Sequence, residues 1–243
     1  MDFELIAESF PKLLGAVDET LILALSSLAI GFALAVLIAL ASLSRWKLLS
    51  GFATGYVYIF RSTPLLVQIF LIYYGSGQFR GVLEDLGLWV LFRDSWFCAV
   101  LALTLNTGAY TSMIIRGGLQ SVPWGQIEAA RAIGMSDLQA FRRIVFPLAI
   151  RQALPAYSNE IILMVKSTSL ASTITILEIT AVSKKIIAAT YQPIEVFLIA
   201  GALYLSMNFV ITRGVRWVED YLNPLERQRR QTNGEQANGS AAR

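Results

Sequence analysis

Two ionisable residues lie inside a long apolar stretch, where a charge is costly unless it meets a ligand or a partner. Glu160 and Lys166 stand within Leu148–Leu177. On a helix that turns by about 100° per residue, they share a polar sector roughly 120° wide with Asn159 and Ser167. The two charges are then about 9 Å apart along the axis. This spacing leaves room for a zwitterion, with Glu160 facing an ammonium or guanidinium group and Lys166 a carboxylate. The alternative is that both residues pair with charges on neighbouring helices, or that the Lys166 side chain extends towards water at the membrane interface.

Polar residues in two other apolar stretches are candidates for the same site. Arg61 precedes Pro64, which withdraws a backbone hydrogen bond and predicts a kinked helix. Gln68 lies seven residues after Arg61, about two turns further along such a helix. Arg61 either anchors the end of its helix, or closes a gate and offers a partner to a carboxylate. Asn106 and Tyr110 are one helical turn apart and either line the same cavity or make interhelical hydrogen bonds.

The composition is that of a membrane protein and excludes several kinds of enzyme. Of 243 residues, 55% are hydrophobic and 15% charged, with a mean hydropathy of +0.57; a soluble domain has about 25% charged residues. With no His and one Cys, histidine catalysis, Cys/His zinc sites and disulfides within the chain are excluded. No G-x-x-x-x-G-K-[ST] loop for nucleotide phosphates occurs. We therefore expect no catalytic residue, no metal site and no cofactor.

Five apolar stretches are long enough to cross a bilayer core of about 30 Å. They are Leu21–Leu43, Phe52–Tyr74, Ser95–Ile115, Leu148–Leu177 and Ile194–Ile211. The fourth contains Arg151, Glu160 and Lys166, and it is counted because charges can face a protein interior. We therefore predict an all-α integral membrane protein with five transmembrane helices within residues 17–222. Residues 1–16 are expected to lie outside, and the polar residues 223–243 to form a disordered inner tail.

The distribution of Lys and Arg predicts an outside N-terminus and a cytoplasmic C-terminus. More basic residues lie on the inner side than on the outer side. The inner side holds Arg45, Lys47, Arg116, Arg131, Arg142, Arg143, Arg151, Arg213, Arg216, Arg227, Arg229, Arg230 and Arg243. The outer side holds Lys12, Arg80, Arg93, Lys184 and Lys185. Their spread along the chain does not suggest nucleic acid, whereas the tail arginines are placed to contact anionic lipid. A Gly51-x-x-x-Gly55 motif is a weak sign of close helix packing.

The inner loop 121–147 carries explicit signals for two short helices. Ser121 and Pro123 predict the start of a helix that runs to about Ile133. Gly134 stands where a left-handed C-cap belongs, and Ser136 with Gln139 forms a capping box for the second helix. Pro147 ends or kinks that helix.

The same loop resembles a known family motif. Glu128, Ala129, Ala130, Gly134, Ile144 and Pro147 match the EAA loop of bacterial ABC importer permeases, with Phe146 where that pattern has Leu. The resemblance implies a type I importer transmembrane domain whose loop docks into a separate ATPase. On their residue types alone, these two helices would be a surface hairpin without a partner.

The resemblance extends from about Asp18 to Arg227 and points to polar amino acid permeases. It is carried by Arg61–Pro64, Asn106–Tyr110, Leu154–Glu160, Lys166–Leu170 and Ala189–Pro193. The run from Asn106 is most similar to permease subunits for histidine, lysine, arginine and ornithine, and for opines such as octopine and nopaline. It implies an inner-membrane subunit with a dimeric ATPase that binds ATP and Mg, a periplasmic binding protein, and a second permease subunit, preferably a paralogue but otherwise an identical copy.

These expectations favour an importer that works by alternating access. An amino acid channel that needs no ATP would also explain charges in the spans, although it would not explain the capped loop. A purely structural membrane subunit is the third possibility. The sequence does not choose the amino acid or opine, nor does it say whether this subunit or its partner holds the substrate site.

Overall fold

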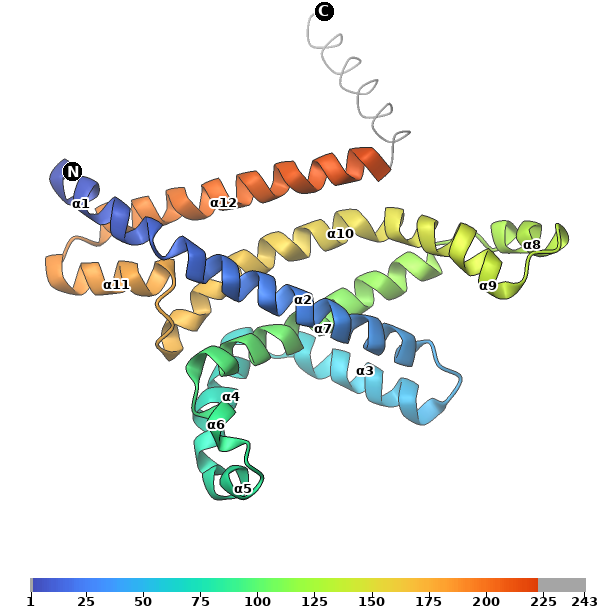
Figure 1. Cartoon of the computed structure of the whole chain (residues 1–243), viewed down its shortest axis with the longest axis horizontal. Coiled ribbons are helices and arrows are strands. Elements are labelled where there is room, and N and C mark those ends of the chain that lie inside the picture. Colours follow the sequence, from blue (N-terminus) through green and yellow to red (C-terminus); the bar gives the residue numbers. More distant parts are fainter. Residues whose placement is uncertain (1, 223–243) are drawn as a thin grey trace, which may run out of the picture.

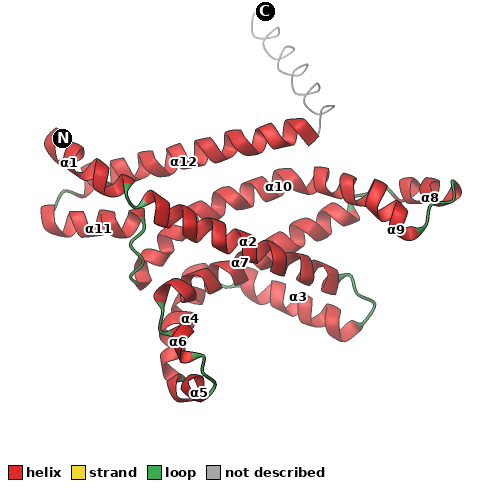
Figure 2. Cartoon of the chain, viewed as in Figure 1, coloured by secondary structure: helices red, strands yellow, loops and turns green. Residues whose placement is uncertain are grey.

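The computed structural model describes residues 2–222, and every regular element in that range is helical (Figure 2). A backbone that crosses lipid must satisfy its own hydrogen bonds, and long apolar sequences therefore form helices there. Many large apolar side chains point outward along these helices; on α2 (Val17–Ser42) they include Ile22, Leu25, Leu37 and Leu40. The expected tail 223–243 lies outside the described residues.

Three described helices are long and apolar enough to cross a membrane unaided. They contain α2, α7 (Ser95–Gln120) and most of α12 (Pro193–Leu222), and they correspond to the first, third and fifth predicted spans. Two bent helix pairs bring the possible number of spans within residues 2–222 to five. The structure thus has three to five candidate spans.

The second predicted span is not one kinked helix. It is divided into α3 (Lys47–Ser62) and α4 (Leu65–Gln78), which meet at 102°. Thr63 and Pro64 are extended between them, with ψ angles of 142° and 133°. Proline disfavours a helical residue before it and cannot donate the next helical hydrogen bond, and the helix therefore stops instead of bending.

The fourth predicted span combines several helical forms. A π-helical segment η1 (Phe141–Val145) leads into α10 (Phe146–Ser167), and the 3₁₀ helix η2 (Thr168–Ile174) follows. Pro147 lies in the first turn of α10, directly after the π-helical segment η1. The helical run continues from Asp137 to Ile174, and Pro147 therefore does not end the helix that starts at Asp137. After η2 the chain bends by 49° into α11 (Ile179–Thr190).

Short helices complete the two ends of the molecule (Figure 1). Near the N-terminus, α1 (Phe3–Leu14) is capped by the Asp2 carboxylate and packs on α11 and α12. The extracellular position predicted for residues 1–16 stays a prediction. α5 (Arg80–Asp85) and α6 (Trp89–Phe92) follow α4 away from the main bundle, and α8 (Trp124–Ala132) and α9 (Asp137–Ala140) project at the opposite end from α1.

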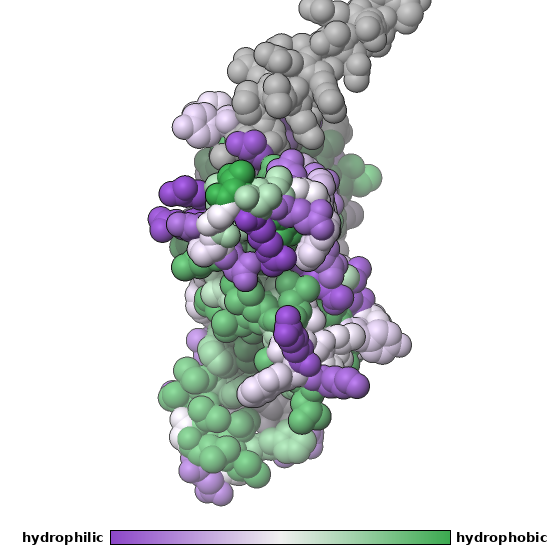
Figure 3. All heavy atoms as spheres, turned by 90° about the vertical axis from the view of Figure 1, so that its right-hand side faces the viewer, coloured by the Kyte–Doolittle hydropathy of each residue, from purple (hydrophilic) through white to green (hydrophobic). Residues whose placement is uncertain are grey.

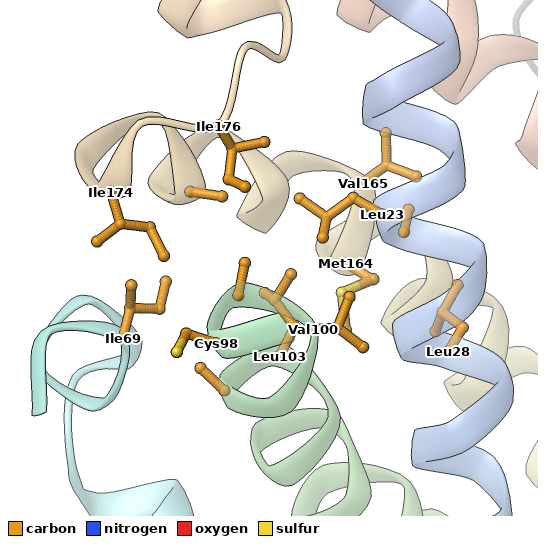
Figure 4. Close-up of a cluster of buried hydrophobic side chains, with 14 residues drawn as sticks. Leu23, Leu28, Ile69, Cys98, Val100, Leu103, Met164, Val165, Ile174 and Ile176 are labelled. Carbon is orange, nitrogen blue, oxygen red and sulfur yellow. The ribbon is translucent and has the colours of Figure 1, made fainter. Parts of the chain in front are cut away.

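The larger core joins α2, α4, α7, α10 and η2 (Figure 4). Its buried side chains include Leu23 and Leu28 of α2, Leu103 of α7, Ile69 of α4 and Val165 of α10. A second cluster joins α1, α11 and α12, with Leu13, Ile179 and Val196 fully buried. The first core holds α4 and α10 against α7, and α7 is therefore the centre around which polar groups can gather.

Glycine allows the closest approaches to α7. A Cβ atom on Gly31 of α2 would lie 2.3 Å from Cγ2 of Thr107, and one on Gly118 would lie 2.7 Å from the carbonyl oxygen of Ala149. Gly51 and Gly55 have open space around them. The sequence motif therefore does not mark a close contact within this chain.

Candidate functional site

The α3–α4 break opens a cavity of about 450 Å³ between α3, α4, α7 and α10. Its wall consists of the break itself and of facing turns of the two longer helices: Arg61, Ser62, Thr63, Pro64, Leu65, Asn106, Tyr110, Glu160, Leu163, Met164 and Ser167. A cavity of this size suits a small ligand. It carries polar and charged groups in an otherwise apolar bundle.

Glu160 supplies the negative charge of this wall. Its side chain is buried, with the residue 8% exposed, and the hydroxyl of Thr107 donates a hydrogen bond of 2.8 Å to Oε1. Thr107 is itself 1% exposed. A carboxylate held in a low-dielectric wall attracts a cation more strongly than one in water.

Arg61 supplies the positive charge. It lies in the last turn of α3, and its guanidinium carbon lies 5.2 Å from the centre of the Tyr110 ring on α7. A cation over an aromatic face is attracted by the ring quadrupole. The cavity is therefore lined by a carboxyl group from α10 and a guanidinium group from α3.

Gln68 and Asn106 form a hydrogen-bonded layer behind the break. The amide nitrogen of Gln68 donates to the carbonyl oxygens of Phe60 and Thr63, at 2.9 and 3.1 Å, and to Oγ1 of Thr63 at 2.8 Å. Nδ2 of Asn106 donates to Oε1 of Gln68 at 3.0 Å and to the Phe60 carbonyl at 3.3 Å. Carbonyls that the broken helix cannot satisfy thus find side-chain donors.

The loop 121–147 forms a separate feature at the end of the molecule. Gly134 is left-handed, with φ of +82°, and Ser136 and Gln139 make the reciprocal hydrogen bonds of a capping box. Arg131 and Asp137 join the two short helices through an ion pair of 3.0 Å. Figure 3 views the molecule from this end, where hydrophilic side chains gather at the height that α8 and α9 have in Figure 1. The left-handed glycine and the capping box confirm the predicted turn chemistry.

The start of the first loop helix differs from the prediction. α8 begins at Trp124, and the extended residue before it is Pro123. Ser121 belongs to the end of α7 and donates its hydroxyl to the carbonyl oxygen of Gly118. Because ψ of Pro123 is 131°, proline cannot be the first helical residue, and Ser121 is too far back to cap the helix.

Comparison with known proteins decides what kind of chain this is. Residues 17–223 match the family model described as "Binding-protein-dependent transport system inner membrane component". The chain belongs to this family. It is therefore a multi-pass inner-membrane permease subunit of an ABC importer and has no catalytic role of its own. The family implies a transporter that also contains a separate ATPase and a binding protein.

Individual relatives agree with this assignment over nearly the whole chain. The permease is 66% identical to the nopaline transport system permease protein NocM of Agrobacterium fabrum (94% of this chain, 95% of the relative). It is 53% identical to the octopine transport system permease protein OccM of Rhizobium meliloti (92% and 91%). The solved structure titled "Crystal structure of an amino acid ABC transporter with histidines" matches with a TM-score of 0.80 and 33% identity (91% and 99%).

The structure brings together five of the residues that the sequence singled out for substrate. Arg61, Asn106, Tyr110, Glu160 and Ser167 line the cavity of the permease. Their contact with substrate stays a prediction.

Three other candidates lie outside the cavity wall. Gln68 is buried behind it, and Asn159 and Lys166 are exposed on α10 and absent from the lining. Lys166 therefore does not share this cavity wall with Glu160, and the role of either residue in substrate binding stays a prediction. The cavity wall takes Glu160, Leu163, Met164 and Ser167 from α10, whereas Asn159 and Lys166 lie on another part of the helix surface.

The predicted ATPase-coupling residues differ in exposure. Glu128, Ala129 and Gly134 are exposed, Ala130 is buried, and Ile144 and Pro147 are half-buried. Their coupling role also stays a prediction. Within residues 2–222 there is no group of three or more His, Cys, Asp or Glu side chains able to hold a metal ion.

Sequence reasoning missed two buried polar contacts. Thr107 contacts Glu160, and its position beside Asn106 in the family-like segment was the available signal. Glu178 is fully buried, caps α11 through the backbone N–H groups of Thr180 and Ala181, and accepts a 2.7 Å hydrogen bond from Tyr204. A lone acid between Leu177 and Ile179 was its signal.

Proposed function

We propose that this permease carries cationic amino acids or opines through the cavity at the α3–α4 break, by alternating access driven by the separate ATPase. Relatives named for nopaline and octopine, similar over nine-tenths of the chain, support the substrate class. ATP and Mg bind to the ATPase, and a periplasmic binding protein delivers the substrate.

The observation that carries this proposal is the buried carboxylate of Glu160 in the cavity wall. A buried charge is retained where it has a partner, and the Thr107 hydroxyl that donates to Glu160 carries no charge of its own. A ligand ammonium or guanidinium group supplies the missing positive charge. Glu160 is thus the main determinant of selectivity for cations.

Arg61 provides the complementary contact. Its guanidinium group lines the same cavity and can bind a substrate carboxylate through two parallel hydrogen bonds. An α-amino acid with a basic side chain carries one carboxylate and two cationic groups. This arrangement replaces Lys166 by Arg61 as the carboxylate partner, and Lys166 is left for a contact outside this chain's cavity.

The loop 121–147 is the part we assign to ATPase coupling. Ile133 and Leu138 are 73% and 75% exposed at the tip of the α8–α9 hairpin, beside the exposed Glu128. Apolar side chains at the end of a capped hairpin suit a hydrophobic groove on a partner. An exposed ion pair of Arg131 and Asp137 joins α8 to α9. The hairpin follows α7 and leads into α10 along the chain, and it can therefore pass movement of the ATPase to both helices.

We further propose an outside N-terminus, a cytoplasmic C-terminus and a paired permease subunit. α1 and α11 lie at the opposite end of the bundle from α8 and α9 (Figure 1), in keeping with the distribution of basic residues. Three to five spans are too few to enclose a substrate path alone, and a paralogous second subunit is the preferred partner.

Substrate binding to the purified transporter tests the proposal. Radiolabelled arginine, lysine, histidine, ornithine, nopaline, octopine and glutamate are offered to the complete complex in nanodiscs, in the absence of binding protein. We expect saturable binding of the compounds with a basic side-chain group, no binding of glutamate, and a loss of at least about tenfold in affinity for Glu160→Gln. The matched control is Glu84→Gln, on the exposed helix α5.

Energy dependence separates the importer from a channel. Uptake into proteoliposomes that contain the binding protein must stop when ATP is withheld. Binding that is unchanged in Glu160→Gln, or preferential binding of acidic amino acids, would overturn the assignment of the cavity.

A further inference from the structure

We infer that Gln68 is a positioning residue that sets the geometry of the substrate cavity without contacting the substrate. The inference rests on the proposed function of that cavity. It starts from a contrast in the structure: Gln68 is buried and outside the cavity lining, whereas two of its hydrogen-bond partners, Thr63 and Asn106, form part of the wall.

One side chain holds both sides of the helix break. Gln68 lies in the first turn of α4, where its backbone N–H donates to the carbonyl oxygen of Pro64. Its side-chain amide reaches back across the break to the carbonyls of Phe60 and Thr63. The two N–H bonds of this amide are shared among three acceptors within 3.1 Å. These hydrogen bonds therefore hold the end of α3 and the start of α4 together at the break.

The same amide ties the break to the central helix. Its oxygen accepts the 3.0 Å hydrogen bond from Asn106 on α7, and Asn106 also donates to the Phe60 carbonyl. Gln68, Asn106 and Phe60 therefore form a closed triangle of hydrogen bonds between α3, α4 and α7. Arg61 follows Phe60 directly, and this triangle consequently holds the backbone from which the Arg61 side chain extends towards the cavity.

The backbone at the break explains why a side chain is needed as hydrogen-bond donor to the Phe60 carbonyl. Pro64 has no N–H to offer to the Phe60 carbonyl, four residues earlier. Within lipid, water is not available to replace it. Thr63 satisfies the neighbouring carbonyl of Ile59 through its own hydroxyl, at 2.8 Å. Without Gln68, the Phe60 carbonyl keeps one side-chain donor, Asn106. The side-chain hydrogen bonds between α4 and the end of α3 are then lost.

The test compares Gln68→Met, which keeps the side-chain length and removes the amide, with Gln78→Met. Gln78 is exposed at the far end of the same helix. Equilibrium binding of radiolabelled arginine, basal ATP hydrolysis without binding protein, and thermal unfolding are measured on the complete transporter in nanodiscs. We expect Gln68→Met to weaken arginine binding about tenfold with basal hydrolysis within about twofold of the unmodified transporter, and Gln78→Met to change neither.

Two outcomes would overturn the inference: arginine binding unchanged in Gln68→Met, or binding and basal hydrolysis lost in parallel, as for a purely structural residue. If Gln68→Met does not assemble, Gln68→Asn, one methylene shorter, takes its place with the same expectation. Glu160→Gln is measured in the same series. No effect of Glu160→Gln means that the proposed function has failed, whereas an effect of Glu160→Gln without one of Gln68→Met means that only the positioning role has failed.

Discussion

Thr107 on α7 donates a 2.8 Å hydrogen bond to Glu160 on α10, although the two residues are 53 positions apart in the chain. The contact fixes which way the carboxylate faces, and it is itself held by packing, since Cγ2 of Thr107 fills the space that a Cβ on Gly31 would need. Gly31 on α2, Thr107 on α7 and Glu160 on α10 thus form one chain of contacts. The orientation of the proposed substrate-binding group therefore depends on the packing of α2 against α7.

Thr107→Val should weaken substrate binding while keeping the shape of the side chain. The change removes the hydroxyl that orients Glu160, and a hydrogen bond to a charged group contributes about 1.5–3 kcal/mol. We expect arginine affinity to fall about tenfold, as measured by equilibrium binding in nanodiscs. Thr107→Ser keeps the hydroxyl and should stay much closer to the unmodified affinity. Equal losses in the two variants would show that packing, and not the hydrogen bond, matters.

Gly31→Ala should destabilise the bundle. The added Cβ would lie 2.3 Å from Cγ2 of the buried Thr107, and overpacking of this kind costs about 1–3 kcal/mol. A lower midpoint of thermal unfolding in detergent is the expected result. Gly51→Ala is the matched control, because nothing lies within 4 Å of a Cβ there. A larger loss at Gly51 would point to contacts with another subunit.

Gly134→Val should uncouple transport from the ATPase. Gly134 has φ of +82°, and a β-branched residue is strongly disfavoured in that region. We expect the hairpin of α8 and α9 to rearrange, ATP-driven uptake to disappear and the permease still to reach the membrane. Uptake is measured in proteoliposomes and membrane content by immunoblot.

The control for this experiment is Gly134→Asn, since asparagine tolerates the left-handed conformation. It should retain a large part of the uptake. Normal ATP-driven uptake by Gly134→Val would contradict the role given to this turn.

Single cysteines should report the two sides of the membrane. The natural Cys98 is fully buried, and Cys98→Ala provides a background in which Lys12→Cys or Leu138→Cys is the only thiol. In spheroplasts, a membrane-impermeant maleimide should label Lys12→Cys at once and Leu138→Cys only after permeabilisation. The reverse order would invert the proposed topology.

Much of this molecule was predictable because it is local. Bilayer-length apolar runs such as Leu21–Leu43 formed helices, and the left-handed Gly134 and the capping box of Ser136 and Gln139 appeared where their neighbours dictated. Pro64 predicted an irregularity in the second span, but the local sequence did not predict that the helix would break at an angle of 102°. In each case the controlling interactions connect residues within a few positions of one another.

The cavity proposed for substrate depends on the tertiary structure. Arg61, Asn106 and Glu160 could be selected by type, but only the rotation and crossing of α3, α7 and α10 decided that they share a wall and that Lys166 does not. The partners Thr107 and Gln68, and the tight contact at Gly31, depend on the same rotations. A helical sequence determines its own periodicity, whereas the way in which two distant helices face each other is set by the packing of all their neighbours.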